Sequence, residues 1–282
     1  MSKWHLIIDV ARCENCNNCV LAHKDELVGN DFPGYSAAHP LHGAGALRIE
    51  RRVRGEGHLV DVAYLPTMCN HCDDAPCVAA GNGAVKQRAD GIVLFDPVRA
   101  KGRRDLVEAC PYGSVVWNEE AQLPQTLFFD AHLLDQGWKA PRCVQSCPTD
   151  AIEAVKLPDA EMAQRAARDG LAVLRPALGT RPRVYYRHLH RFQSCFIGGT
   201  VLVRHGGTVD VVVGARVHLQ REEHVLRTLE TDLFGDFKFD AIEPHSGPYR
   251  VVVESLCGAA QVNARVDHES VVLPDIVLDA HS

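Results

Sequence analysis

The sequence has 282 residues, a formal net charge of −6, 46% hydrophobic residues and 23% charged residues. This length suffices for one large domain or two ordinary ones, and the composition is that of a globular protein. The acidic balance argues against a protein that coats nucleic acid or an anionic membrane. No run of about 18 consecutive apolar residues predicts a membrane span, and the N-terminus is unlike a signal peptide, so we expect a cytoplasmic chain.

The first half of the sequence mixes short strands, glycine-rich turns and cysteine motifs. Apolar runs at residues 6–10 and 91–96 predict strands. The basic run at residues 48–54 predicts a solvated loop or strand edge, and a patch that binds an acidic partner is the lesser alternative. A helix is predicted between Asp159, as its N-cap, and Gly170, as its stop signal.

The sequence becomes rich in strand patterns from about residue 196. Phe237 and Phe239 lie two positions apart, on one face of a predicted strand, and are candidate core residues. Further strands are predicted at residues 199–203, 209–213, 215–219 and 249–253, separated by glycine turns. This spacing predicts a small antiparallel β-sandwich. The expected fold class is α+β, with an N-terminal domain at residues 1–190 and the sandwich at residues 191–282.

Eleven cysteines are present, and nine of them precede residue 148. A disulfide framework fits poorly, because the count is odd and the chain is long with no secretion signal. Cys195 and Cys257 are isolated in the second half and are interpreted as small apolar side chains, as is Cys143.

Two cysteine triads have the spacing of iron–sulfur ligands. A bacterial ferredoxin motif is C-x2-C-x2-C-x3-C-P, in which three cysteines bind one cluster and the fourth binds another. The first triad matches it, and the second is a variant with a longer gap before its third cysteine. Their members are Cys13, Cys16 and Cys19, then Cys69, Cys72 and Cys77.

Neither triad is followed by its own Cys-Pro pair. His23 occupies that slot after the first triad and is interpreted as a residue at the surface or beside the ligands, and Gly81 occupies it after the second. Two isolated Cys-Pro pairs, at Cys110 and Cys147, can supply the fourth cysteine that each triad needs. Two triads and two further cysteines make two four-thiolate sites. The spacing does not decide which triad is completed by Cys110 and which by Cys147. Zinc also binds C-x2-C pairs, but this spacing pattern favours iron–sulfur clusters.

These motifs resemble the iron–sulfur subunits of the dimethyl sulfoxide reductase group of molybdopterin enzymes. Within that group they are most similar to small subunits of the pyrogallol–phloroglucinol transhydroxylase and resorcinol hydroxylase type. The similar stretches are residues 8–13, 33–35, 75–79, 81–85, 90–94, 110–113, 131–134, 181–186 and 234–241. The resemblance therefore extends over nearly the whole chain.

The resemblance implies a nested pairing of the motifs and a large partner subunit. Cys13, Cys16, Cys19 and Cys147 would bind one [4Fe–4S] cluster, and Cys69, Cys72, Cys77 and Cys110 the other. It also implies a ferredoxin-like cluster domain and a transthyretin-like C-terminal sandwich. The partner would carry the molybdenum or tungsten pterin, so no catalytic residue is expected in this chain.

The chain departs from its relatives at a third site. Those subunits resemble three-cluster proteins, and their third cluster would use the slots that here hold His23, Leu127, Asp130 and Cys143. Three of these four residues are not cysteine, so two clusters are expected and Cys143 is interpreted as a relic.

The expected function is electron transfer within a heterodimer whose catalytic subunit hydroxylates or transhydroxylates phenolic compounds. Two alternatives remain open from the sequence. One is a structural module in which metal only braces the fold, and the other is a free-standing polyferredoxin.

Overall fold

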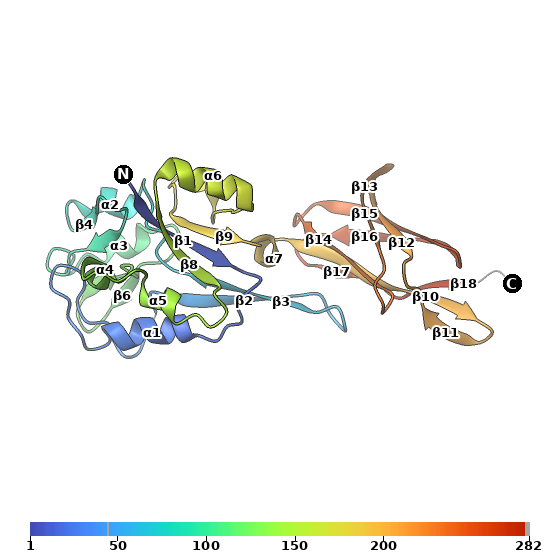
Figure 1. Cartoon of the computed structure of the whole chain (residues 1–282), viewed down its shortest axis with the longest axis horizontal. Coiled ribbons are helices and arrows are strands. Elements are labelled where there is room, and N and C mark those ends of the chain that lie inside the picture. The colour runs from blue at the N-terminus through green and yellow to red at the C-terminus, as the bar shows by residue number, and fades with distance from the viewer. Residues whose placement is uncertain (44, 280–282) are drawn as a thin grey trace. The chain divides into compact units, whose positions relative to one another are not determined.

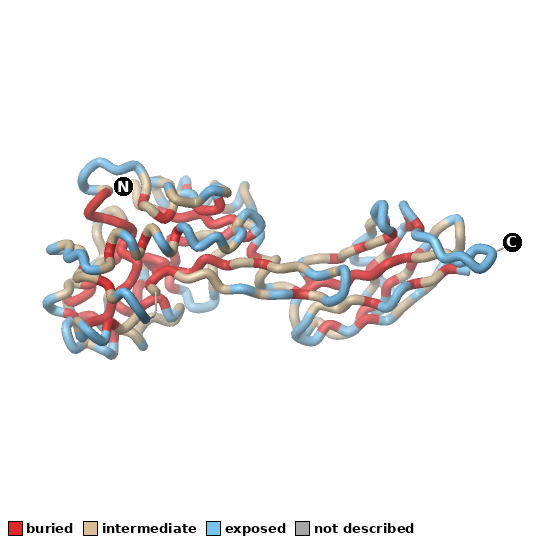
Figure 2. The backbone as a smooth tube through the Cα atoms, turned by 90° about the horizontal axis from the view of Figure 1, so that it is seen from below, coloured by how far each residue is buried: buried red, intermediate tan, exposed pale blue. Residues whose placement is uncertain are grey.

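A computed structural model describes residues 1–43 and 45–279 of the chain. The fold divides into two compact units. The first contains residues 1–51 and 64–189, and the second contains residues 52–63 and those from 190 onward. Buried segments run through the interior of each unit and exposed residues lie in its outer loops (Figure 2). Within the described residues, no helix is both long and apolar enough to span a bilayer.

The first unit is built on a three-stranded sheet. Its central strand is β1 (Lys3–Asp9), which pairs antiparallel with β8 (Ile152–Leu157) and parallel with β9 (Val184–Arg187). The interior of β1 is apolar and fully buried, as the run at residues 6–10 predicted. Helix α6 (Asp159–Asp169) lies beside this sheet (Figure 1).

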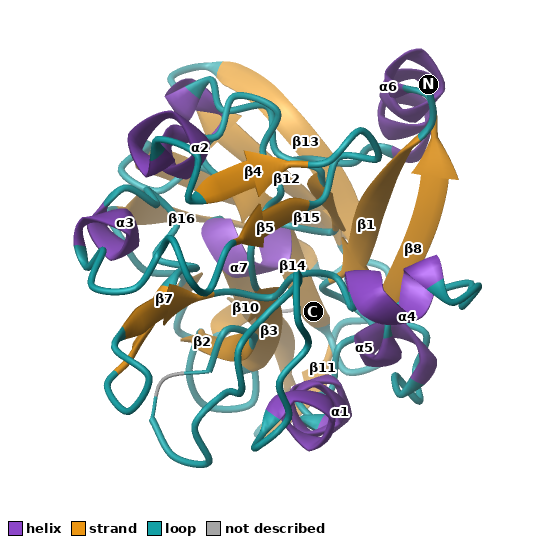
Figure 3. Cartoon of the chain, turned by 90° about the vertical axis from the view of Figure 1, so that its left-hand side faces the viewer, coloured by secondary structure: helices purple, strands orange, loops and turns teal. Residues whose placement is uncertain are grey.

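Short elements surround this sheet and carry the cysteine motifs. Three two-stranded ribbons are β2 (Arg48–Arg54) with β3 (Asp61–Thr67), β4 (Val85–Gln87) with β5 (Val93–Phe95), and β6 (Val116–Asn118) with β7 (Leu123–Gln125). The helices are α1 (Asn18–Leu27), α2 (Pro76–Gly81), α3 (Asp105–Glu108), α4 (Ala131–Asp135), α5 (Arg142–Gln145) and the 3-10 turn η1 (Pro176–Leu178). Helices α1 and α5 lie side by side (Figure 3).

The predicted helix at residues 159–170 is confirmed, but its N-cap is not Asp159. The N-cap is Pro158, and Asp159 is the first helical residue. The Asp159 carboxylate accepts hydrogen bonds from Lys3 and Arg183 instead of capping the helix. Gly170 ends the helix in the left-handed conformation, which glycine adopts without steric cost.

The second unit is a β-sandwich. One sheet has the order β11 (Thr208–Val211), β10 (Cys195–His205), β14 (Asp236–Ile242), with β17 (Val271–Val272) and β18 (Ile276–Asp279) also paired to β10. The other has the order β13 (His224–Glu230), β12 (Arg216–Arg221), β15 (Gly247–Ser255), β16 (Gly258–Val266). Helix α7 (His190–Gln193) precedes β10, which is the first of these strands in the sequence.

The expectation of a wholly antiparallel sandwich is wrong in one respect. Strands β17 and β18 both run parallel to β10. Strand β10 has 11 residues, so it is long enough to pair with several partners along its length. Phe237 and Phe239 do point into the core between the two sheets, with ring centroids 5.9 Å apart, as predicted.

The basic run at residues 48–54 is not a solvated loop throughout. It forms strand β2, and Arg54 at its end is buried, with 2% of its surface exposed. Arg54 forms ion pairs with Asp61 and with Asp240, the latter at 2.8 Å between Nη1 and Oδ1. A buried guanidinium requires such partners because desolvation of an unpaired charge is costly.

The core position of Phe239 predicts a large effect of its removal. Phe239→Ala should lower the free energy of unfolding by about 3–5 kcal/mol, because it leaves a cavity in a packed core. This corresponds to a fall of more than about 10 °C in the melting temperature of a unit of this size, measurable by differential scanning calorimetry. Phe234→Ala is the control, because Phe234 is 72% exposed and its loss should change stability by less than about 0.5 kcal/mol. Equal effects of the two changes would contradict this packing.

Candidate metal centres

Cys13 and Cys16 of the first triad lie in the loop that connects β1 to α1, and Cys19 is the second residue of α1. Asp9, the last residue of β1, orders this loop by accepting a hydrogen bond from the Ala11 amide at Oδ1 and from the Cys13 amide at its backbone oxygen. Asn15 and Asn17 adopt left-handed backbone conformations, which asparagine tolerates better than most residues. The loop is mostly exposed, and Cys16 is exposed with it.

Cys147 joins the first triad from a distant part of the sequence. Cys13, Cys16, Cys19 and Cys147 line one small pocket. Its remaining walls include apolar residues of β8 and the β2–β3 ribbon. Cys147 follows the four-residue helix α5, which leads the chain to this pocket. The structure therefore brings together the four thiols of the first predicted set.

The second triad lies between β3 and α2. Cys69 and Cys72 occupy a buried loop, and Cys77 is the second residue of α2, whose first residue is Pro76. Proline is favoured at this helix position because its missing amide has no helical acceptor there. The longer gap between Cys72 and Cys77 contains Asp73 and Asp74, two acidic residues that hold the loop in place as described below.

Cys110 lies with the second triad. It follows the short helix α3, as Cys147 follows α5. Cys72 and Cys77 belong to an apolar cluster against which Cys110 packs. Cys69 interacts electrostatically with Cys77, Cys110 and Cys72. The thiols of the second set are therefore neighbours, and three of the four are buried.

Burial and mutual proximity disfavour ionisation of these thiols in the absence of a positive charge. Desolvation, followed by the neighbouring cysteines, raises the pKa of Cys19 and of Cys77 to about 12. The pKa of Cys72 is raised to about 11, mainly by burial. The pKa of Cys69 is raised well above its ordinary value, again by burial first. Thiolates at these positions require a cationic centre, and an iron–sulfur cluster bound by four cysteines supplies one.

The two Cys-Pro cysteines share a hydrogen-bonding pattern. The Ser114 amide donates to Cys110 Sγ over 3.4 Å, and the Ala151 amide donates to Cys147 Sγ over 3.2 Å. Each donor lies four residues after its cysteine. Amide donors directed at sulfur stabilise a thiolate and tune a cluster that the thiolate binds. Both sets therefore fit an iron–sulfur cluster in sulfur count and in the orientation of local donors.

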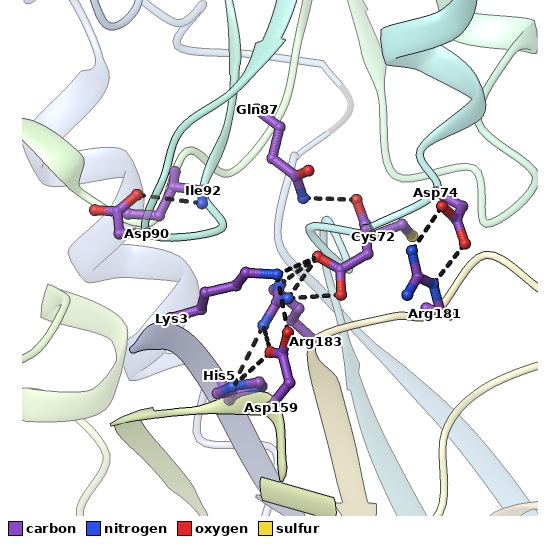
Figure 4. Close-up of polar contacts among 11 residues, drawn as sticks. Lys3, His5, Cys72, Asp74, Gln87, Asp90, Ile92, Asp159, Arg181 and Arg183 are labelled. Atoms are coloured by element: carbon purple, nitrogen blue, oxygen red, sulfur yellow. Dashed lines mark hydrogen bonds and ion pairs between the residues drawn. The ribbon is translucent and has the colours of Figure 1, made fainter. Parts of the chain in front are cut away.

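The loop that contains Cys72 is held by an ion-pair network around the buried Arg183 (Figure 4). Arg183, 2% exposed, donates to Asp73 Oδ2 over 2.6 Å and to Asp159 Oδ1 over 3.0 Å. Lys3 bridges the same two carboxylates. The backbone adds three hydrogen bonds. The Arg183 amide donates to the carbonyl of Asn70. The Asp73 amide donates to the carbonyl of Arg181, and the Asp74 amide to that of Thr180. Residues 180–183 thus hold the loop that contains Cys72.

His5 completes this network. It is 2% exposed, and its Nε2 lies 3.3 Å from Arg183 Nη1 (Figure 4). Burial and the adjacent Arg183 charge lower the pKa of His5 to about 4. His5 is therefore neutral at physiological pH, and its Nε2 accepts the hydrogen bond that Arg183 donates.

The residues at the third-site slots are all buried. His23 is 3% exposed, so its interpretation as a surface residue is wrong. Its ring lies edge-on to His39, with centroids 5.2 Å apart, and burial lowers its pKa to about 3. Leu127, Asp130 and Cys143 are each 1% exposed, and Asp130 Oδ2 accepts a hydrogen bond from the Arg142 amide.

The remaining cysteines differ in their environment. Cys195 is fully buried in the sandwich core, in agreement with its interpretation as an apolar residue. Cys257 is half-buried and packs against the same core, so it makes the apolar contacts expected of it without being fully buried. Among residues 1–43 and 45–279, no three His, Cys, Asp or Glu side chains converge on a point that would hold a single metal ion.

Comparisons with known proteins agree with the cysteine pattern. Residues 60–157 match a family model described as a 4Fe-4S dicluster domain. The chain is 42% identical over 281 residues to the pyrogallol hydroxytransferase small subunit of Pelobacter acidigallici, covering 99% of this chain and 100% of that protein. It is 35% identical over 193 residues to a subunit of the tetrathionate reductase of Salmonella typhimurium, covering 65% and 72% respectively. The chain belongs to the iron–sulfur subunit family of the dimethyl sulfoxide reductase group.

Two further similarities are weaker. The iron–sulfur subunit of the arsenate respiratory reductase of Shewanella is 28% identical over 234 residues, which cover 64% of this chain and 94% of that protein. A solved structure of 5-hydroxyisourate hydrolase from Klebsiella pneumoniae matches 32% of this chain and 91% of that chain, at 25% identity and a TM-score of 0.25. The family assignment rests on the two stronger relatives.

Sequence reasoning does not find the network around Arg183. In the sequence, residues 181–186 stand out only as a stretch similar to the family. Two signals are present: the acidic pair Asp73-Asp74 in the widened triad, and the basic residues Arg181 and Arg183 at alternate positions before a strand. Neither signal identifies a partner, because the two segments are more than 100 residues apart.

Loss of the buried arginine should destabilise the first unit. Arg183→Met leaves the partly buried carboxylate of Asp73 with Lys3 as its cationic partner. The free energy of unfolding should fall by about 3 kcal/mol, since one member of a largely buried ion pair is removed. The melting temperature of this unit should fall by about 6–12 °C. Arg181→Met is the matched control, because Arg181 and Asp74 are 66% and 57% exposed and such pairs contribute less than about 1 kcal/mol. Similar losses in the two variants would contradict the role of burial.

The lowered pKa of His5 predicts a pH dependence. The unfolded chain binds a proton at His5 below its ordinary pKa of 6.5, whereas the folded chain does so only near pH 4. The stability that neutral His5 contributes is therefore present above pH 6.5 and is lost as the pH falls towards 4, by about 3 kcal/mol. His5→Gln removes the titrating group, so its melting temperature should fall less steeply between pH 6.5 and 4.5 than that of the wild type. A constant gap between the two proteins from pH 8 to 4.5 would contradict this.

Proposed function

We propose that this chain is the electron-transfer subunit of a heterodimeric molybdenum or tungsten pterin enzyme, and that it binds two [4Fe–4S] clusters. Cys13, Cys16, Cys19 and Cys147 bind one cluster. Cys69, Cys72, Cys77 and Cys110 bind the other. The clusters lie in a ferredoxin-like domain at residues 1–190, followed by a transthyretin-like sandwich at residues 191–282.

The observation that carries this proposal is the nested grouping of the thiols. Cys147 lines the same pocket as the first triad, although it lies 128 positions after Cys19 in the sequence. Cys110 instead packs against the second triad. A fold that gathers eight of eleven cysteines into two groups of four matches the four-cysteine ligation of a [4Fe–4S] cluster. The family match over residues 60–157 supports the same interpretation.

The residues of the chain have distinct roles in this proposal. When bound, the clusters supply one-electron storage, with potentials set by charge, hydrogen bonds to sulfur and solvent exposure. The eight thiolates hold them, and the amides of Ser114 and Ala151 donate to two of the sulfurs. The buried second set shields its sulfurs from water, whereas Cys16 leaves the first set open to solvent. The first set is thus accessible to a redox partner.

The substrate is proposed from the relatives and not from this chain. The pyrogallol hydroxytransferase small subunit is similar over the full length of both chains. We therefore propose a catalytic partner that hydroxylates or transhydroxylates phenolic compounds, with its substrate pocket in that partner. The sandwich contains neither of the two thiol groups, and its proposed role is to stabilise the complex. A cytoplasmic location remains a prediction.

Metal analysis of the full chain tests the ligand sets. Anaerobically purified protein should contain about eight irons and eight acid-labile sulfides per chain. Cys77→Ser should remove the ligation of one cluster and leave about four irons. Cys13→Ser should do the same for the other cluster, and electron paramagnetic resonance of the reduced proteins should show that a different signal is lost in each.

Cys257→Ser is the control for these changes. Cys257 is half-buried in the second unit and belongs to neither thiol set, so its loss should leave iron and sulfide unchanged. About twelve irons in the wild type would indicate a third cluster that includes Cys143. Zinc without sulfide would overturn the electron-transfer proposal and favour the structural module.

A further inference from the structure

One peptide bond connects a guanidinium to a sulfur of the second thiol set. The Ser114 amide donates to Cys110 Sγ over 3.4 Å. The carbonyl of the same peptide bond belongs to Gly113, and it accepts a hydrogen bond from Arg48 Nη1 over 2.9 Å. A cation, a peptide bond and a cysteine sulfur are therefore joined by one continuous series of hydrogen bonds.

The surrounding contacts hold this peptide bond in place. Arg48 is the first residue of β2, and its Nη2 lies 3.4 Å from the carbonyl oxygen of Tyr112. Its guanidinium thus contacts two successive carbonyls of the turn that follows Cys110. Ser114 is 1% exposed, and its hydroxyl donates to the carbonyl of Met68 over 2.8 Å. The peptide bond is therefore held at both of its residues.

Hydrogen bonds in such a series strengthen one another. A donor at the carbonyl oxygen draws electron density towards that oxygen, which makes the amide of the same peptide bond a better donor. The effect is larger when the outer donor is ionised, because charge-assisted hydrogen bonds are about twice as strong as neutral ones. An arginine side chain stays charged in proteins. Arg48 should therefore strengthen the hydrogen bond that Cys110 Sγ accepts.

We propose that Arg48 raises the reduction potential of the cluster bound by the second thiol set, by polarising the peptide bond between Gly113 and Ser114. This inference rests on the proposed cluster-binding function. Reduction adds negative charge, part of which lies on the cysteine sulfurs, and a stronger amide donor stabilises that charge. One electron enters, from dithionite in a titration, and both hydrogen-bonding protons stay on their own nitrogens. Arg48 acts through the peptide bond and is a positioning residue.

A carboxylate beside Arg48 limits the size of the effect. Glu50 Oε1 lies 3.5 Å from Arg48 Nη2, and the two side chains are 43% and 38% exposed. Solvent and the carboxylate therefore screen part of the guanidinium charge. The hydrogen bond from Nη1 to the Gly113 carbonyl is shorter than this ion pair and is the stronger contact. The expected shift in potential is consequently moderate.

The first thiol set has the same peptide arrangement with a different charge beside it. Asp150 stands three residues after Cys147 and adopts a left-handed conformation, as Gly113 does in the other turn. The Ala151 amide donates to Cys147 Sγ over 3.2 Å. Arg12, a cation beside this turn, contacts the Asp150 carboxylate at 3.7 Å, so its charge is directed at a carboxylate and not at the peptide bond. The proposed effect should therefore be confined to one cluster.

A redox titration of the full-length, iron-loaded chain tests this proposal. The protein is titrated potentiometrically with dithionite and mediators and followed by electron paramagnetic resonance, and the signal that is lost in Cys77→Ser identifies the relevant cluster. Arg48→Met removes both the charge and the donor. It should make reduction of this cluster at least about threefold less favourable, a shift of about 28 mV to more negative potential for one electron. The potential of the other cluster should not change.

Arg175→Met is the matched control. Arg175 contacts the same turn, because its Nη1 donates to the carbonyl of Pro111. Within the described residues, the amide of that peptide bond, which belongs to Tyr112, makes no hydrogen bond to a sulfur. Removal of this charge should shift the potential by less than half as much as Arg48→Met. An equal shift would overturn the proposal, because it would assign the effect to any positive charge near the turn.

The outcomes separate the role of Arg48 from the cluster proposal. Unchanged potentials in an Arg48→Met protein with full iron and sulfide content would overturn the role of Arg48 alone. If Arg48→Met loses iron, Arg48→Gln replaces it, because glutamine keeps a polar side chain without the charge. A negative shift of the cluster in that variant supports the proposal, and no shift overturns it. A wild-type chain that binds neither iron nor sulfide would overturn the proposed function and the role of Arg48 together.

Discussion

The ion pair between the buried Arg183 and the partly buried Asp73 is the interaction on which the first unit depends. It joins the start of β9 to the loop of the second triad, and through Asp159 and Lys3 it reaches α6 and β1. Two charges removed from water are stable only with good geometry and further hydrogen bonds, which His5 and the backbone supply here. The space is tightly filled: a Cβ on Gly91 would lie 2.8 Å from Arg183 Nε.

The same construction recurs in the second unit around Arg54. This arginine is as buried as Arg183 and lies between the carboxylates of Asp61 and Asp240, which also interact with Lys238. In each unit a guanidinium joins segments that are distant in sequence, because its planar fork can bind two carboxylates at once. The remainder of each interior is largely apolar, so these pairs fix which segments lie together.

The two thiol groups share one local backbone arrangement but lie in two different environments. A helical turn, a Cys-Pro pair and an amide four residues later bring Cys110 and Cys147 to their sites. The surroundings differ, because the first group opens to solvent at Cys16 and the second is enclosed. Solvent exposure and hydrogen bonds to sulfur are the protein's means of setting a cluster potential. Two groups of four thiols thus lie in unequal surroundings.

The sequence by itself determined the cysteine motifs, the apolar strands and the core positions of Phe237 and Phe239. These depend on spacing and periodicity, which are local properties of the chain. It left open which Cys-Pro cysteine meets which triad, and it assigned Asp159 to a helix cap. Only the tertiary structure decided these points, because Arg183 competes for the Asp159 carboxylate and approaches from β9. Thr180 and Tyr112 likewise meet only after folding, since their hydroxyl groups belong to residues 68 positions apart in the sequence.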